Sequence, residues 1–257
     1  MKRKILIHGA TLILVGSAFG ALFDNLAQAL KSPEEVTQLS IRDDHNLKHF
    51  PSKFSSLINL KELNISCLDS LEDLPADIGR LTKLERIVID NGNGCGMNLS
   101  IPASIGELNN LKVLTLFGAL DPTDQPESLS KVKSLPATIA NLHNLEELDL
   151  GRNRLKSVPA AIGNLKNLKK LGLDYNDIHE IPSSFGELSN LKELSVCSNG
   201  GIKLPESLSK ISGLKIAMGN NYLKLKDQDE LRRRFPQATF NFVNEYDDAA
   251  ANEEAPN

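Results

Sequence analysis

The sequence predicts an α/β solenoid built from a short repeat, with a parallel sheet along one side. Three columns of residues support this: recurring prolines, a leucine nine positions after each proline, and further apolar residues twelve and fourteen positions after six of them. Such columns in fixed register indicate one structural unit repeated along the chain. The prolines are Pro51, Pro75, Pro102, Pro136, Pro159, Pro182 and Pro205, and the leucines are Leu60, Leu84, Leu111, Leu145, Leu168, Leu191 and Leu214.

Each repeat is expected to contain a short strand, a turn, a loop that begins at the proline, and a return segment. Leu148 and Leu150 illustrate the strand, because two apolar residues separated by one position lie on the same face of extended chain. One repeat cannot bury its own apolar face. The repeats are therefore expected to stack as an array with one continuous core.

An asparagine follows the last strand residue in the second half of the chain, at Asn153, Asn176, Asn199 and Asn221. An inward-pointing asparagine can hydrogen-bond backbone groups that parallel strands leave unpaired where they bend. We therefore expect a ladder of asparagines along this half. The equivalent positions in the first half are Asp44, Leu68, Gly92 and Ala119.

The repeat resembles the leucine-rich-repeat family, in the LPxxIGxL subtype of plant Ras-group and many bacterial proteins. The resemblance covers about residues 33 to 225 and implies a horseshoe with its parallel strands on the concave face. It says little about function, since one solenoid serves many partners. The residues that carry it are Leu142, Leu145, Leu148, Leu150, Asn153, Leu155, Val158, Pro159, Ile162, Gly163 and Leu165.

The N-terminus has the pattern of a signal peptide over residues 1–23. Lys2, Arg3 and Lys4 precede an apolar run from Ile5 to Phe23. Cleavage is possible after Gly20 or after Ala29, and an uncleaved membrane anchor is the alternative. We expect an exported protein that is secreted, periplasmic or surface-associated, with a cytoplasmic location as the alternative.

The repeat domain is expected to span residues 24–242, with about eight repeats between two caps. A helix from Ala21 to Leu30 would cap the entry. The segment from Asp227 to Phe242 resembles an exit helix followed by a closing strand, and array ends need such caps to cover their last leucines. Residues 243–257 are predicted to be a disordered acidic tail, because residues 244–257 hold five acidic side chains and no basic one.

Side chains between the strand leucines should face the concave side, where partners of repeat proteins dock. There we expect an apolar cluster with a polar rim. An insertion over residues 117–131 borders it and is either a binding loop or a lid over the core. The predicted partner-binding residues are Val88, Val113, Thr115, Phe117, Asp149, Arg152, Asp174 and Tyr175.

The sequence offers no catalytic, cofactor or metal site. Five histidines lie in the N-terminal segment or in loops and turns, and residues 174–177 lack the spacing of a calcium loop. Three cysteines form no metal-ligand pattern, although Cys67 and Cys95 could pair if the compartment is oxidising. The net charge of −4 with dispersed basic residues excludes a nucleic-acid footprint.

These observations indicate a protein–protein interaction module without enzyme activity that binds another protein through its concave face and irregular loops. One alternative is a structural or surface-adhesion spacer of an exported protein. A second alternative is an enzyme or an enzyme-activating effector. Membrane contact is expected only through the N-terminal apolar segment, if that segment is uncleaved.

Overall fold

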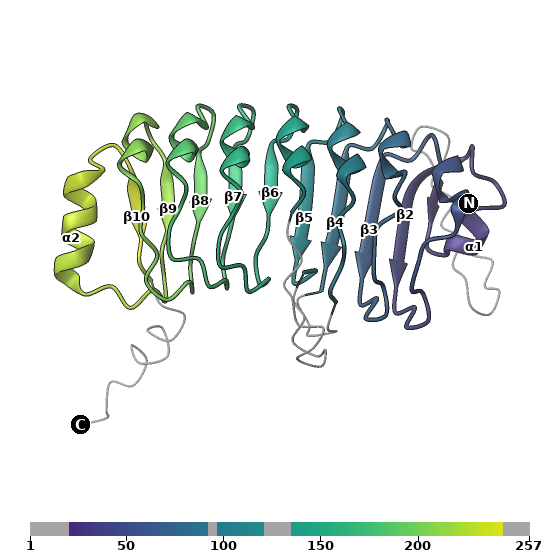
Figure 1. Ribbon diagram of the computed structural model, residues 1–257, viewed down its shortest axis with the longest axis horizontal. Helices are drawn as coiled ribbons and strands as arrows, with labels where there is room; N and C mark the ends of the chain where they lie inside the picture. Colours follow the sequence, from purple (N-terminus) through teal and green to yellow (C-terminus); the bar gives the residue numbers. More distant parts are fainter. Residues whose placement is uncertain (1–20, 92–96, 121–134, 244–257) are drawn as a thin grey trace, which may run out of the picture.

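The computed structural model describes residues 21–91, 97–120 and 135–243, and these residues form a solenoid with one ten-stranded parallel sheet. The strands follow one another in chain order along the long axis of the molecule (Figure 1). The predicted α/β solenoid is therefore confirmed. The strands are β1 (Ala21–Phe23), β2 (Val36–Arg42), β3 (Glu62–Ser66), β4 (Arg86–Asp90), β5 (Val113–Phe117), β6 (Glu147–Asp149), β7 (Lys170–Gly172), β8 (Glu193–Ser195), β9 (Lys215–Ala217) and β10 (Thr239–Asn241).

Short 3-10 helices form a second row beside the sheet. A proline directly precedes six of the seven that the structure describes, and its extended backbone turns the chain into the helix. The helices are η1 (Ser52–Ser56), η2 (Ile78–Arg80), η3 (Ala103–Glu107), η5 (Ala137–Asn141), η6 (Ala160–Asn164), η7 (Ser183–Glu187) and η8 (Glu206–Lys210).

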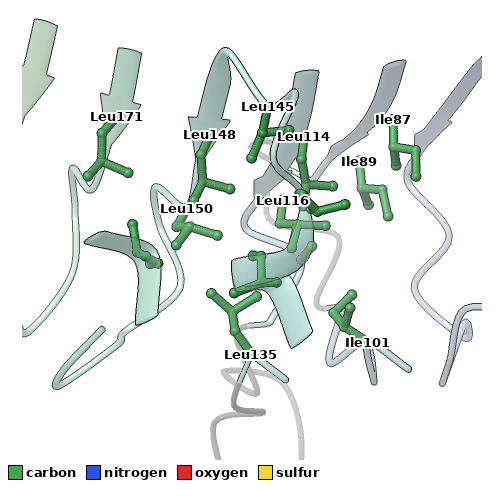
Figure 2. Packing of buried hydrophobic residues seen from close by; sticks show 14 of the residues in the cluster. Ile87, Ile89, Ile101, Leu114, Leu116, Leu135, Leu145, Leu148, Leu150 and Leu171 are labelled. Carbon is green, nitrogen blue, oxygen red and sulfur yellow. The ribbon is translucent and has the colours of Figure 1, made fainter. Parts of the chain in front are cut away.

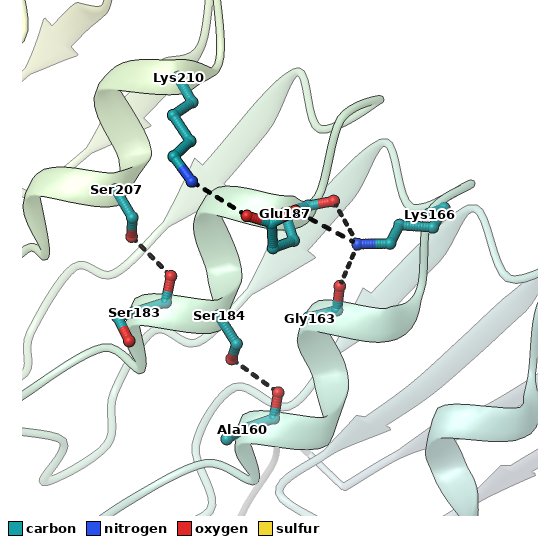
Figure 3. Close-up of polar contacts among 8 residues, drawn as sticks. All are labelled: Ala160, Gly163, Lys166, Ser183, Ser184, Glu187, Ser207 and Lys210. Atoms are coloured by element: carbon teal, nitrogen blue, oxygen red, sulfur yellow. Dashed lines mark hydrogen bonds and ion pairs between the residues drawn. The ribbon is translucent and has the colours of Figure 1, made fainter.

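Neighbouring 3-10 helices contact one another through serines and glycines. The Ser184 hydroxyl donates to the Ala160 carbonyl at 2.7 Å, and Ser207 donates to Ser183 at 2.6 Å (Figure 3). Gly163 permits this close approach, because a Cβ at that position would lie 2.4 Å from the Ser184 backbone oxygen. A side chain there would push the two repeats apart.

One continuous apolar core lies between the two rows. The inward side chains of successive strands, such as Leu114, Leu148 and Leu171, are at most 1% exposed. Figure 2 shows these side chains pointing into the same layer as leucines from the return segments. Because each residue packs against the equivalent residue of the next repeat, the core extends along the whole array.

The predicted asparagine ladder is confirmed, and its four side chains are at most 5% exposed. Asn176 Nδ2 donates to the carbonyls of Leu150 at 3.0 Å and Leu173 at 2.9 Å. Its Oδ1 accepts from the N–H groups of Asn153 at 3.1 Å and Leu155 at 2.9 Å. Each asparagine thus joins its own turn to the turn of the preceding repeat.

The entry cap differs from the prediction. Ala21–Phe23 form β1, which pairs in parallel with β2, and the helix α1 covers only Leu26–Ala29. The expected helix over Ala21 to Leu30 is therefore wrong in its first part. Two contacts explain the difference: the Phe23 side chain is 7% exposed in the core, and the Asn25 side chain caps α1 by accepting from the Gln28 N–H at 3.1 Å.

The exit cap matches the predicted helix and strand. Helix α2 (Leu225–Arg234) and β10 follow β9, and Leu231 and Phe235 bury their side chains in the core. The helix begins two residues before the expected segment. Among the described residues, no helix is both long enough and apolar enough to cross a membrane.

Several predicted features lie outside the described residues. These are the N-terminal segment up to residue 20, Cys95 within residues 92–96, most of the insertion at residues 121–134, and the acidic residues 244–257. At the start of the insertion, Leu120 is buried and its N–H donates to Asn153 Oδ1 at 2.8 Å. This residue therefore belongs to the core.

Candidate functional site

A hollow of about 610 Å³ lies on the solvent face of the sheet, over β5 to β10. It is open to solvent and is lined by outward side chains from every strand between β6 and β10, together with Thr115 of β5. The alternating burial along each strand explains this, since one set of side chains enters the core and the other forms the floor of the hollow.

A row of alternating charges forms one side of the hollow. Glu147, Lys170, Glu193 and Lys215 are neighbours in register on β6 to β9. Lys170 Nζ lies 3.3 Å from Glu147 Oε1, and Lys215 Nζ lies 4.0 Å from Glu193 Oε1. All four side chains are roughly half exposed or more, so water screens these pairs and each adds little stability.

Small residues give the hollow its depth. Gly172, Ser195 and Ala217 occupy equivalent positions on β7, β8 and β9. Their short side chains place the backbone floor below the row of charged side chains. A partner can therefore approach the sheet backbone more closely here than over β3 to β5, where the middle row is Asn64, Val88 and Thr115.

Asp149 holds a carboxylate on this floor. Its Oδ1 accepts a hydrogen bond from the Gly151 N–H at 2.9 Å. Burial raises the pKa of Asp149, the Gly151 N–H opposes this shift, and the negative charges of Asp174 and Asp90 add to it. The surroundings of Asp149 therefore disfavour the ionised form of its carboxyl group.

Two glycines make room for Asp149 and for Phe117. A Cβ at Gly172 would lie 2.8 Å from Asp149 Oδ1. A Cβ at Gly151 would lie 2.7 Å from Cε2 of the Phe117 ring and 3.2 Å from Asp149 Oδ1. The aromatic ring and the carboxylate therefore both lie close to the Gly151 backbone, and neither leaves room for a side chain at that position.

Asp174 organises the next part of the hollow. Its Oδ1 accepts from the Ser195 hydroxyl and from the Cys197 N–H, both at 2.6 Å. Burial, followed by the charge of Asp174, raises the pKa of the Cys197 thiol. The thiol therefore stays protonated at neutral pH, which is the opposite of what a nucleophilic cysteine requires.

The predicted apolar cluster lies together on β4 and β5, but it is half-buried. Val88 pairs with Thr115 in register, and Val113 and Phe117 flank Thr115 on the same strand. Neighbouring strands on both sides limit the exposure of these side chains, and the Phe117 ring also covers Gly151. Of the eight predicted residues, Thr115, Asp149 and Asp174 line the hollow.

Arg152 and Tyr175 occupy equivalent turn positions just beyond the strands and do not line the hollow. Both have a left-handed backbone, with φ values of 58° and 54°. Their N–H groups donate to the carbonyls of Asp174 at 2.8 Å and Cys197 at 2.9 Å. Both side chains are exposed beside the hollow and can serve as its rim.

The histidines that the structure describes provide no catalytic arrangement. His45 Nδ1 lies 2.9 Å from Asp69, and His49 Nδ1 lies 2.9 Å from Asp73, on the exposed surface of the first repeats. The hydrogen bond to Asp69, followed by its charge, raises the pKa of His45. Within the described ranges, no group of histidine, cysteine, aspartate and glutamate side chains is placed to hold a metal ion.

Comparison with known proteins agrees with the repeat. A family model described as a leucine-rich repeat region matches residues 126–222. Over these residues the chain is similar to the leucine-rich-repeat family. InlP of Listeria monocytogenes shares its fold, with a TM-score of 0.57, 22% sequence identity, and coverage of 78% of this chain and 55% of that one.

Two curated proteins are similar to part of this sequence. Uridine 5'-monophosphate transferase of Xanthomonas campestris is 32% identical over 93 residues, which are 36% of this chain and 16% of that protein. TMV resistance protein N of Nicotiana glutinosa is 32% identical over 170 residues, which are 60% of this chain and 14% of that protein. The chain therefore spans only a small part of the length of these two relatives.

Sequence reasoning missed the part of the hollow over β9 and β10, which includes Lys215, Ala217 and Thr239. The leucine columns weaken there, so the solvent-facing positions could not be assigned. It also missed Gly151 and Gly172. Their signal was present in the sequence, because a glycine in or beside a strand often marks a close approach of another group.

Proposed function

We propose that this chain is a protein-interaction module that binds another protein across the solvent face of its sheet. The observation that carries the proposal is the open hollow over β5 to β10, which has charged side chains along one side. Six strands at about 4.8 Å spacing make it roughly 24 Å long, which suits an extended segment or a protein surface better than a small metabolite. The sequence similarity to a plant resistance protein supports an interaction role.

The charge of the face supports a protein partner over a nucleic acid. The hollow carries Asp149 and Asp174 in addition to its two paired glutamate–lysine neighbours. These carboxylates would repel phosphate groups, and the chain has a net charge of −4. A protein surface with complementary polar groups avoids that repulsion.

We assign the binding face to the eight predicted residues together with the floor and the charged row of the hollow. Val88, Val113 and Phe117 supply its apolar border, and Arg152 and Tyr175 supply a rim. The repeat is also proposed to belong to the LPxxIGxL subtype, because a proline precedes most of the 3-10 helices and a glycine such as Gly163 lets them pack closely.

Export is the proposed location. Strand β1 begins at Ala21, and Ala29 is fully buried, so cleavage after Gly20 would leave the entry cap intact, whereas cleavage after Ala29 would remove β1 and α1. We therefore favour a signal segment that ends at Gly20. The repeat domain then extends to about residue 242, followed by an acidic tail over residues 243–257.

A spacer role and an enzyme role are the competing functions. A spacer needs no hollow on its sheet face. An enzyme needs an activated group, and the protonated Cys197 thiol and the solvent-exposed His45 and His49 do not supply one. The transferase matches over only 16% of its own length, so its activity is a weak guide for this chain.

The proposal is tested by filling the hollow. Ala217→Trp places a large side chain on its floor, where the small residue faces solvent. The matched control is Ala160→Trp, which adds the same side chain at an exposed position of η6 on the opposite row (Figure 3). Crosslinking pull-downs from the source organism compare both variants with the wild-type chain, and circular dichroism checks their folding.

We expect Ala217→Trp to lose a specific partner that Ala160→Trp keeps. If both variants recover the same proteins as the wild-type chain, the hollow is not the binding site and the spacer role becomes the better account. If Ala160→Trp alone loses the partner, the binding face lies on the row of 3-10 helices.

A further inference from the structure

The floor of the hollow is a row of short side chains that crosses the strands. Gly172, Ser195 and Ala217 are neighbours in register on β7, β8 and β9. The same row continues to Asp149 on β6 and to Asn241 on β10, whose longer side chains mark its two ends. The hollow of about 610 Å³ lies over this row, so a partner has room to lie along the axis of the solenoid.

The charged row beside this floor alternates in sign from strand to strand. Its members are Glu147, Lys170, Glu193 and Lys215. Between 44% and 70% of each side chain is exposed. A carboxylate can accept about four hydrogen bonds and an ammonium group can donate three, so each member can bind a second group of opposite charge besides its neighbour in the row.

The spacing of the charged row matches an α-helix. Neighbouring strands lie about 4.8 Å apart, so the four charges extend over about 14 Å. Helix positions i, i+3, i+7 and i+10 share one face and extend over about 15 Å. Four side chains on one face of an extended segment cover about 20 Å, so they would lose step with the row.

We propose that the hollow receives an α-helix of the partner protein, whose facing side chains alternate between basic and acidic in step with the charged row. The inference rests on the proposed function and names the element and the charge pattern that this face recognises. Basic residues of the helix would face Glu147 and Glu193, and acidic residues would face Lys170 and Lys215. The short side chains of the floor favour a helix, because they leave space for a body about 10 Å wide beside the charges.

The test uses two capped peptides of identical composition with four charges at positions i, i+3, i+7 and i+10. Both are stapled on the opposite face, so that they are equally helical. The alternating peptide carries lysine, glutamate, lysine and glutamate, and it matches all four charges of the row. The blocked peptide carries two lysines followed by two glutamates, and it matches only two charges in either direction of the helix.

Binding to the full chain is followed by NMR through the backbone amides of Gly172 and Ala217, which line the hollow. We expect saturable shifts with the alternating peptide and about tenfold weaker binding of the blocked peptide, because several exposed pairs that are individually weak change together.

A double exchange in the protein should reverse this preference. Lys170→Glu with Glu193→Lys leaves the net charge unchanged and converts the row into two acidic side chains followed by two basic ones. This variant should bind the blocked peptide about tenfold more tightly than the alternating one. The matched control is Glu85→Lys with Lys112→Glu, which exchanges a half-exposed ion pair outside the hollow and should keep the wild-type preference.

The proposal is overturned if the alternating peptide produces no saturable shifts, if the wild type binds both peptides equally, or if the exchange at Lys170 and Glu193 has no more effect than the control exchange. Equal binding of an unstapled alternating peptide with a central proline, which interrupts a helix, also overturns it.

Failure of the proposed function looks different. If the partner from the pull-down is lost by Ala217→Trp but binds the variant exchanged at Lys170 and Glu193 like the wild type, the interaction face stands and the alternating helix does not. If Ala217→Trp binds that partner normally, the interaction face itself is wrong.

Discussion

The buried Asn176 side chain should be a major source of stability, and Asn176→Ala tests this. The substitution removes Oδ1, which accepts from the N–H groups of Asn153 and Leu155. The Leu150 carbonyl keeps a second donor in Asn153 Nδ2, and the Leu173 carbonyl keeps one in Asn199 Nδ2. Two buried N–H groups are therefore left without their acceptor, whereas both carbonyls remain bonded.

An unsatisfied buried polar group costs roughly 1–3 kcal/mol, so Asn176→Ala should lower the free energy of unfolding by about 2–6 kcal/mol. Asn190→Ala is the matched control. Asn190 Nδ2 donates to the Lys166 carbonyl at 2.8 Å in an exposed position, where water can replace the lost bond. Asn190→Ala should therefore lower the free energy of unfolding by no more than about 1 kcal/mol.

Urea unfolding followed by far-ultraviolet circular dichroism measures both variants. Because repeat arrays can unfold in parts, tryptic cleavage near the substituted repeat serves as a second, local measurement. The expected result is a much lower midpoint for Asn176→Ala than for Asn190→Ala. Equal midpoints would refute the view that the buried ladder, rather than leucine packing alone, holds adjacent turns together.

Substitutions at three further positions have clear expected outcomes. Gly163→Ala should lower the free energy of unfolding by about 1–3 kcal/mol, because the new Cβ would lie 2.4 Å from the Ser184 backbone oxygen; an unchanged urea midpoint contradicts this. Ser198 has a φ of 56°, a left-handed conformation that favours glycine and disfavours valine. The urea midpoint should therefore be highest for Ser198→Gly, intermediate for the wild type and lowest for Ser198→Val. A valine variant as stable as the wild type would show that the turn tolerates other conformations. Burial raises the pKa of Asp149 in the folded chain above the unfolded value of about 3.9. The folded state therefore loses stability as pH rises above about 3.9 and the Asp149 carboxylate ionises. Asp149→Asn should therefore exceed wild type in thermal stability at neutral pH and lose this advantage below about pH 3.9, whereas a constant difference would exclude ionisation as the cause.

The repeat and its buried asparagines could be predicted because both depend on local spacing. A leucine such as Leu148 enters the core whichever repeat precedes it. Each asparagine of the ladder bonds to the carbonyl three residues before it, as Asn153 does to Leu150. The entry cap escaped prediction for the opposite reason. Ala21–Phe23 resemble the end of an apolar helix in composition, but their pairing with β2 decides that they form a strand.

The candidate site shows the same division. The sequence by itself determined which strand positions face solvent, and so it placed Thr115, Asp149 and Asp174 on the face that carries the hollow. Only the tertiary structure decided that the hollow extends to β10, and that Asp149 and Phe117 both approach Gly151. The physical reason is that alternation within a strand is a local property, whereas depth, burial and the meeting of side chains from different repeats depend on how the repeats stack.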